Sequence, residues 1–186
     1  MFLGFILFFN KIETPNLLKR IFEDVYGSGY NITEYAEPEY TKTLTATANN
    51  VYVHDSVFLY CSSSSNGGAL YCSSNVYKLL VEQSFFISCN TSSSLGGGIC
   101  FISTSNGECV LSKICGFNCT STRYDTSTVI GLFARIAPKN EIWYKNHVNG
   151  RMSLQCISVN LTNNKCYSYR AFQCYDSIVR NATCIL

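Results

Sequence analysis

The chain has 186 residues, about the length of one domain, and carries a formal net charge of +2 at pH 7. Only 14% of its residues are charged, well below the roughly 25% of an average soluble domain. Apart from the adjacent Lys19 and Arg20, the Lys and Arg residues are scattered singly, so no basic cluster points to nucleic acid as a partner.

Residues 1–10 form a short hydrophobic, signal-like segment. It is far below the ~20 residues that a membrane-spanning helix needs. Its length fits the apolar part of a signal peptide, although it lacks a basic start and a clear cleavage site. A cleaved signal peptide and a buried first element of the mature fold both remain open.

Residues 11–40 predict an N-terminal unit made of one helix and a loop. Thr14 suits the helix cap, Pro15 suits the first helical position, and Gly27 suits the end. Apolar residues recur at i, i+4 between them, which predicts an amphipathic helix. We expect this helix to cap the open end of a repeat fold, because a first repeat exposes apolar side chains. Residues 28–40 read as a loop.

From Thr41 onward the pattern changes to β, and residues 41–186 are predicted as one β domain. Thr43–Thr47 and Val51–Val53 are rich in β-branched residues. Asn49–Asn50 between them predicts a turn, because Asn tolerates positive φ.

A similar stretch then occurs twice with a period of about 28 residues, at Ser56–Cys72 and Ser84–Cys100. Each unit runs from an apolar stretch through Cys into a Ser-rich tract, and then reaches adjacent glycines and a second apolar stretch. Such a fixed period is typical of repeat folds. The repeat motif comprises Phe58, Cys61, Gly67, Gly68, Ala69, Leu70, Phe86, Cys89, Gly96, Gly97, Gly98 and Ile99.

Each repeat predicts three short strands and three turns, which describe one triangular coil. The strands of the first repeat are Ala69–Cys72, Val76–Val81 and Phe85–Cys89. Each strand would pair in parallel with its counterpart one coil away, and the Gly pair would form a corner where backbones approach closely. The expected fold is therefore all-β: a parallel β-helix of about four to five coils.

Later coils are less regular. Residues 117–122 resemble 87–92, and 134–150 read as an outgrowth or a longer turn. A fourth coil is expected within 152–174, and 177–186 would open a fifth. We expect the β-helix to be truncated at the C-terminus, and a 1–186 chain to self-associate through this uncapped end.

The cysteines have no paired spacing of the kind that binds zinc, and only two histidines accompany them. No metal or other cofactor is therefore expected. Stacking of equivalent cysteines as buried thiols and pairing in disulfides both remain open. The cysteines are Cys61, Cys72, Cys89, Cys100, Cys109, Cys115, Cys119, Cys156, Cys166, Cys174 and Cys184.

Five Asn-x-Ser/Thr sequons are candidate N-glycosylation sites if the chain enters a secretory pathway. They are Asn31, Asn90, Asn118, Asn160 and Asn181.

The glycine motifs resemble the repeats of the polymorphic outer membrane protein family. Gly67–Leu70 and Gly97–Ile99 match its Gly-Gly-Ala-Ile motif, and Phe58–Cys61 and Phe86–Cys89 stand at its Phe-x-x-Asn motif, with Cys in place of Asn. Similar repeats occur in surface proteins of trichomonad protists. The resemblance covers residues 51–102 well and the rest to 186 loosely. It implies that the β-helix is right-handed and pectin lyase-like, and it implies an extracellular or cell-surface location and a role in adhesion.

Enzymes with this fold, such as polysaccharide lyases and hydrolases, need clustered carboxylates on one face. Asp55 and Glu82, 27 positions apart, are the pair that neighbouring coils could bring together. His54, Asp55 and Ser56 are the residue types of a catalytic triad, but consecutive strand residues alternate faces. We therefore expect no enzyme and keep a carbohydrate-active enzyme as the alternative.

Tyrosines in or beside strands could stack on sugar rings or anchor a partner protein. The expected partners are glycans or surface proteins of a host or partner. The alternatives are that the rings fill the interior or cover apolar surface, and that the chain is a purely structural module. These tyrosines are Tyr52, Tyr60, Tyr71, Tyr77, Tyr144, Tyr167, Tyr169 and Tyr175.

Overall fold

The structure, a computed structural model, describes residues 21–92, 96–103 and 107–121. Beyond them it describes the backbone of seven strands, β15 to β21. Within these residues the only helix is α2 (Phe22–Tyr26), and every other regular element is a strand. The expected all-β class is confirmed. The segment 1–10 and the predicted helix start at Thr14 lie outside the described residues.

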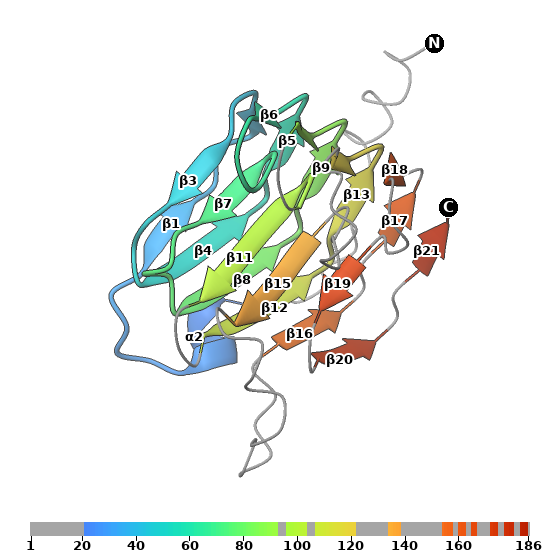
Figure 1. Ribbon diagram of the computed structural model, residues 1–186. Helices are drawn as coiled ribbons and strands as arrows, with labels where there is room; N and C mark the ends of the chain where they lie inside the picture. Colours follow the sequence, from blue (N-terminus) through green and yellow to red (C-terminus); the bar gives the residue numbers. More distant parts are fainter. Residues whose placement is uncertain are drawn as a thin grey trace.

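The strands form four sheets in which every pairing is parallel (Figure 1). Sheet A has the order β1 (Thr33–Tyr35), β4 (Asn50–His54), β8 (Lys78–Glu82), β12 (Glu108–Ser112), β16 (Leu154–Ile157) and β20 (Ser177–Arg180). Sheet B has the order β2 (Glu39–Tyr40), β5 (Val57–Leu59), β9 (Phe85–Ile87), β13 (Cys115–Phe117), β17 (Asn160–Thr162) and β21 (Thr183–Ile185).

The other two sheets are shorter. Sheet C has the order β3 (Leu44–Ala46), β7 (Leu70–Cys72), β11 (Ile99–Ser103), β15 (Ala134–Pro138) and β19 (Phe172–Cys174). Sheet D has the order β6 (Ser62–Ser63), β10 (Asn90–Thr91), β14 (Thr120–Ser121) and β18 (Lys165–Cys166). We call one circuit of the chain through the sheets a pass. The first pass, β1 to β3, goes through sheets A, B and C, and the passes from β4 to β19 go through A, B, D and C in that order. The last strands, β20 and β21, lie in sheets A and B.

Three sequence predictions are corrected by this topology. The Ser-rich tracts contain the short strands of a fourth sheet, D, where three strands per repeat were expected. The predicted loop 28–40 contains β1 and β2, and the predicted outgrowth 134–150 begins with β15. Pro138 is tolerated at the end of β15 because β19 pairs only with the first three residues of that strand.

Aromatic rings stack along the inner side of sheet B. The rings of Tyr40 and Phe58 lie 4.7 Å apart at 10°, and those of Phe58 and Phe86 lie 4.7 Å apart at 3°. The next position in register is Gly116, which has no side chain to continue the stack. Parallel pairing in register thus places equivalent side chains of the repeat directly on one another.

The repeat cysteines stack in the same way, as buried thiols. Cys61, Cys89 and Cys119 are each fully buried, and their thiols donate to carbonyl oxygens at 3.2–3.4 Å, those of Tyr40, Phe58 and Phe86. A hydrogen bond with Cys89, together with burial, raises the pKa of Cys61 well above the ordinary value of a thiol. None of the seven cysteines whose side chains the structure describes forms a disulfide.

The glycine pair forms a tight corner before sheet C, as predicted. Gly67 and Gly96 have φ of +68° and +73°, which favour glycine. At Gly68 an added Cβ would lie 2.0 Å from the carbonyl oxygen of Gly97 in the next pass. Ala69 N donates to Gly98 O at 3.0 Å, so the corners of successive passes are hydrogen-bonded directly to each other.

The described part of the helix lies on a sheet face, where an end cap was expected. Phe22 packs on the outward side chains of Tyr52, Leu80 and Val110, which belong to β4, β8 and β12 of sheet A. Gly27 ends the helix with φ +86°, as predicted. The reason for the difference is that the outer face of sheet A is itself apolar at these positions and needs a cover.

We predict that Phe86→Ala lowers the free energy of unfolding by about 3–5 kcal/mol, because it removes a ring from the middle of a closely packed stack. The neighbouring Phe85 is only half-buried, so Phe85→Ala should cost no more than about 2 kcal/mol. Chemical denaturation of both variants measures the difference. Equal losses would contradict the ring stack.

We also predict that Gly68→Ala costs roughly 3 kcal/mol, because the new methyl group meets backbone that cannot move without breaking the corner. Gly29→Ala is the control: its Cβ meets nothing within 4 Å, and its φ of +93° accounts for about 1 kcal/mol. Thermal unfolding of the two variants distinguishes the cases. A Gly68 variant as stable as the Gly29 variant would overturn the corner assignment.

Candidate functional site: a polar cluster on the outer face of sheet A

The ends of the sheet A strands carry a column of buried polar residues. His54, Glu82 and Ser112 are aligned by the parallel register and are 5%, 0% and 2% exposed. They lie on the outward side, because the preceding residues Val53 and Val81 belong to the core between the sheets. Polar side chains buried on the outside of a sheet need partners, and the partners come from the adjoining corner.

The residue after each of these strands has a left-handed backbone. The φ values of Asp55, Gln83 and Lys113 are 48°, 46° and 55°. This conformation ends the strand's alternation of faces, so these side chains can reach back to the outer face. With its amide turned so that both ends are satisfied, Gln83 links the other two: its amide nitrogen donates to Asp55 Oδ1 at 2.9 Å, and its amide oxygen accepts from Lys113 Nζ at 3.3 Å.

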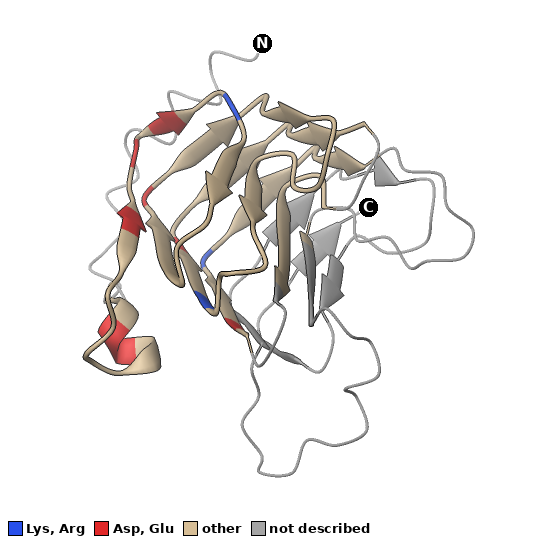
Figure 2. Ribbon diagram, turned by 60° about the vertical axis from the view of Figure 1, so that its left-hand side comes forward, with Lys and Arg blue, Asp and Glu red and all other residues tan. Residues whose placement is uncertain are grey.

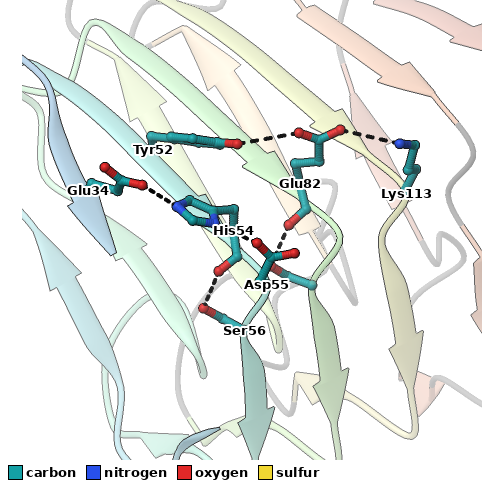
Figure 3. Close-up of polar contacts among 8 residues, drawn as sticks. Glu34, Tyr52, His54, Asp55, Ser56, Glu82 and Lys113 are labelled. Atoms are coloured by element: carbon teal, nitrogen blue, oxygen red, sulfur yellow. Dashed lines mark hydrogen bonds and ion pairs between the residues drawn. The ribbon is translucent and has the colours of Figure 1, made fainter. Parts of the chain in front are cut away.

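His54 lies between two carboxylates (Figure 3). Its Nε2 contacts Oε1 of Glu34 from β1, and its Nδ1 lies 2.9 Å from Asp55 Oδ2. The two carboxylate side chains are 59% and 47% exposed, whereas that of His54 is 7% exposed. His54 therefore ties the first strand of sheet A to the corner after the second.

Glu82 is a fully buried carboxylate held by two neighbours. Its Oε1 lies 3.6 Å from Lys113 Nζ, and its Oε2 accepts a hydrogen bond from the Tyr52 hydroxyl at 3.4 Å. Burial and the charge of Glu82 raise the pKa of Tyr52 far above its usual value, so this hydroxyl stays protonated as a donor. Glu82 is thus bound into the sheet by residues from β4 and from the corner after β12.

The residues singled out from the sequence are partly brought together here. Asp55 and Glu82 do come from consecutive passes on one side, with Asp55 N donating to Glu82 O at 3.3 Å. Ser56 faces the opposite side and donates to the backbone oxygen of His54 at 2.7 Å, so it is not placed to act with the imidazole. The expected alternation was wrong for Asp55, because its positive φ lets it contact His54.

Glu34 and Lys113 are members of this cluster that sequence reasoning missed, and Tyr52 was singled out only as a candidate binding ring. Glu34 stood in a segment read as a loop, and Lys113 in a repeat whose register was loose. The repeat period carried a signal for this cluster. Gln83 follows Asp55 by 28 residues and Lys113 follows Gln83 by 30 residues, and each of the three stands directly after a strand.

The sequons differ in how accessible their amides are. Asn31 is exposed, just before β1. Asn90 Oδ1 accepts from Ser62 Oγ at 2.8 Å, and Asn118 Nδ2 donates to Ser88 Oγ at 3.1 Å, so these two amides are engaged within the fold. Asn160 lies in β17, and Asn181 is outside the described residues.

The two carboxylate partners of His54 are reachable from solvent, whereas Glu82 is fully buried. In the part of the chain that the structure describes, no group of three or more His, Cys, Asp and Glu side chains is arranged to hold a metal ion. No helix among the described residues is long and apolar enough to span a membrane.

Comparison with protein-family models, with curated proteins and with solved structures finds no match for this chain. The resemblance to polymorphic outer membrane protein repeats therefore stays a prediction.

We predict that Lys113→Met lowers the free energy of unfolding by about 3 kcal/mol, because a buried carboxylate loses its cation. Adding Glu82→Gln should recover part of this loss, with a coupling energy of about 1–2 kcal/mol in the double-mutant cycle. Urea denaturation of the two single variants and the double variant measures the coupling. Strictly additive effects would show that the two side chains do not interact.

Proposed function

We propose that the chain is a right-handed parallel β-helix of the pectin lyase-like type, and that it serves as a binding module of a cell-surface or secreted protein. The ordered visits to sheets A, B, D and C on successive passes support the winding. Connections between parallel strands of one sheet are right-handed in about 98% of known cases, which supports the hand.

The observation that supports the binding role is that Tyr60 is exposed and has an unfavourable backbone conformation. This ring is 58% exposed, and its backbone has a φ of +54°, a conformation that is rare and costly for a bulky residue. The equivalent corners of the next two passes carry Ser88 and Asn118. A large ring that is neither buried nor suited to its backbone gains nothing for folding, and such strain is a reason to infer function.

A second exposed ring, Tyr77, lies at the corner before β8 and is 43% exposed. The other described strand tyrosines serve the fold: Tyr52 is 5% exposed beneath Phe22, and Tyr71 packs against Cys100. The four tyrosines beyond residue 140 lie outside the described residues. The predicted row of outward aromatic rings is therefore reduced, among the described residues, to rings at corners.

Exposed tyrosine rings suit ligands that offer flat apolar faces together with hydroxyl groups. The ring stacks on the face of a sugar, and its hydroxyl hydrogen-bonds to the rim. Glycans or the surface proteins of a host or partner are accordingly the proposed ligands. An extracellular or cell-surface location goes with this proposal, and Asn31 is then the best exposed of the described sequons.

We predict that Tyr60→Asn abolishes ligand binding while leaving the fold as stable or up to about 1 kcal/mol more stable, because Asn suits a left-handed backbone. Binding is measured on a glycan array and on host cells, and stability by thermal unfolding. Thr47→Ala, at another exposed position, is the matched control. Binding that survives both Tyr60→Asn and Tyr77→Ser would contradict the proposal.

A carbohydrate-active enzyme is the second candidate, and the position of His54 between the accessible carboxylates Glu34 and Asp55 is what favours it. A lyase or hydrolase would depolymerise polysaccharide, and assays with and without calcium test for this activity. His54→Gln should then remove the activity while leaving glycan binding in place. Silence in both the binding and the depolymerisation assays would favour a purely structural module of a larger surface protein.

A further inference from the structure

Two columns of polar side chains flank the buried repeat cysteines. The residues before these cysteines stand at the corner between sheets B and D, and the residues after them open the strands of sheet D. We call the first set, Tyr60, Ser88 and Asn118, the corner column, and the second set, Ser62, Asn90 and Thr120, the sheet D column. All six residues are exposed or half-buried, so both columns face solvent.

The parallel register aligns the members of each column. Asn90 pairs with Ser62 on one side and with Thr120 on the other. In the corner column, the backbone N–H groups of Tyr60 and Ser88 donate to carbonyl oxygens of the next pass at 2.9 and 2.8 Å, and the three residues share a φ of 52–54°. Neighbouring members of a column are therefore about 4.8 Å apart, which is the distance between paired strands.

Side-chain hydrogen bonds run along both columns and orient two amides. Ser62 Oγ donates to Asn90 Oδ1 at 2.8 Å, and Asn118 Nδ2 donates to Ser88 Oγ at 3.1 Å. Among the described residues, the other ends of these amides, Asn90 Nδ2 and Asn118 Oδ1, have no hydrogen-bond partner. One amide thus offers a donor and the other offers an acceptor, each held in place by its neighbour in the column.

The surface around the two columns carries little charge. Among the residues whose side chains the structure describes, every charged residue belongs to α2, to the first pass, or to an end of a sheet A strand and the residue after it. Figure 2 shows these residues in colour and the other described strands in tan. The strands of sheet D therefore present hydroxyl and amide groups without a charged neighbour in the same strand.

The first pass brings charge nearest to the corner column. The carbonyl oxygen of Lys42 lies 3.5 Å from Cys61 Sγ, so this lysine comes close to Tyr60. The exposed Glu37 and Glu39 of the same pass outweigh its single positive charge. A negatively charged ligand would therefore meet no excess of positive charge here.

A neutral linear glycan matches this surface. A pyranose ring has apolar faces and hydroxyl groups around its rim, and in an extended chain the rings follow one another at about the interval of paired strands. With one ring stacked on Tyr60, the next two rings lie over the third and fourth passes. Asn90 Nδ2 can then donate to a hydroxyl oxygen of the second sugar, and Asn118 Oδ1 can accept from a hydroxyl of the third.

We propose that the corner column and the sheet D column bind a neutral linear glycan that runs across three successive passes, from Tyr60 to Asn118. Tyr60 stacks on the first sugar, Asn90 donates to the second, and Asn118 accepts from the third. The inference rests on the binding role proposed for Tyr60, and it names the ligand class and the residues that extend the site. Asn90 and Asn118 then contact a glycan, whereas their sequons predicted that they carry one.

The test is a titration of the full 186-residue chain with oligosaccharides of one to four units. The neutral probes are cello-, chito-, manno- and galacto-oligosaccharides, and the charged probes are oligogalacturonates and heparin oligosaccharides. At least one neutral series should bind, with an affinity that rises about tenfold from the disaccharide to the trisaccharide, because the third sugar reaches Asn118. The charged series should bind at least about tenfold more weakly than that neutral series.

Two variants assign the second and third sugars. Asn118→Gly removes the amide and suits the left-handed backbone, so it should weaken trisaccharide binding about tenfold and leave disaccharide binding unchanged. Asn90→Asp keeps the acceptor for the Ser62 hydroxyl and removes the Nδ2 donor, so it should weaken both about tenfold. Asn75→Gly, in an exposed turn between β7 and β8, is the matched control and should change neither. Thermal unfolding checks that each variant is folded.

Several outcomes would overturn this proposal and leave the binding role of Tyr60 standing. They are equal affinities for the disaccharide and the trisaccharide, charged glycans bound as tightly as neutral ones, or Tyr60-dependent binding that both asparagine variants retain in full. Binding of host surface proteins through Tyr60, with no neutral glycan bound, would have the same meaning. A chain that binds neither glycans nor host cells would overturn the proposed function, and this inference with it.

Discussion

Parallel pairing in register between successive passes is the constraint on which the rest of the structure depends. It brings the side chains of each strand beside their counterparts in the neighbouring repeat, so residues at equivalent positions must pack against one another. The phenylalanine rings stack, the cysteine thiols stack, and the glycine corners approach closely enough to exclude a Cβ at Gly68. Each column adds apolar contact and backbone hydrogen bonds at once.

The polar side chains on the outer faces are arranged by the corners that follow the strands. Among the described residues, six non-glycine residues at the two corners around sheet B have positive φ, which costs energy. At one corner the side chains of Asp55, Gln83 and Lys113 form polar contacts that offset this cost, and at the other corner those of Ser88 and Asn118 do so. On sheet A these contacts bury Glu82 and hold His54 between carboxylates, so the corner cross-links successive passes. A rigid scaffold of this kind leaves recognition to exposed corners, and Tyr60 stands at one of them.

The repeat made much of the fold predictable. Period and composition placed β4, β7, β8 and β9, identified the glycine corner, and left stacked thiols as one of two options for Cys61 and Cys89. The sequence did not reveal β1 and β2, because two- or three-residue strands rich in Glu look like loop. Sheet D was hidden for a related reason: Ser, Thr and Asn are typical turn residues, and only the neighbouring pass makes them strands. The polar cluster was anticipated only through Asp55 and Glu82.

By itself, the sequence determined which residues repeat, and therefore which side chains must meet once the strands are in register. The tertiary structure decided what covers the outer face of sheet A, which carboxylate is buried, and which tyrosines reach solvent. The physical reason is that period and propensity are local properties, whereas burial depends on what the rest of the chain brings to a site. Tyr52 and Tyr60 are alike in sequence; Phe22 covers one of them, and a left-handed corner exposes the other.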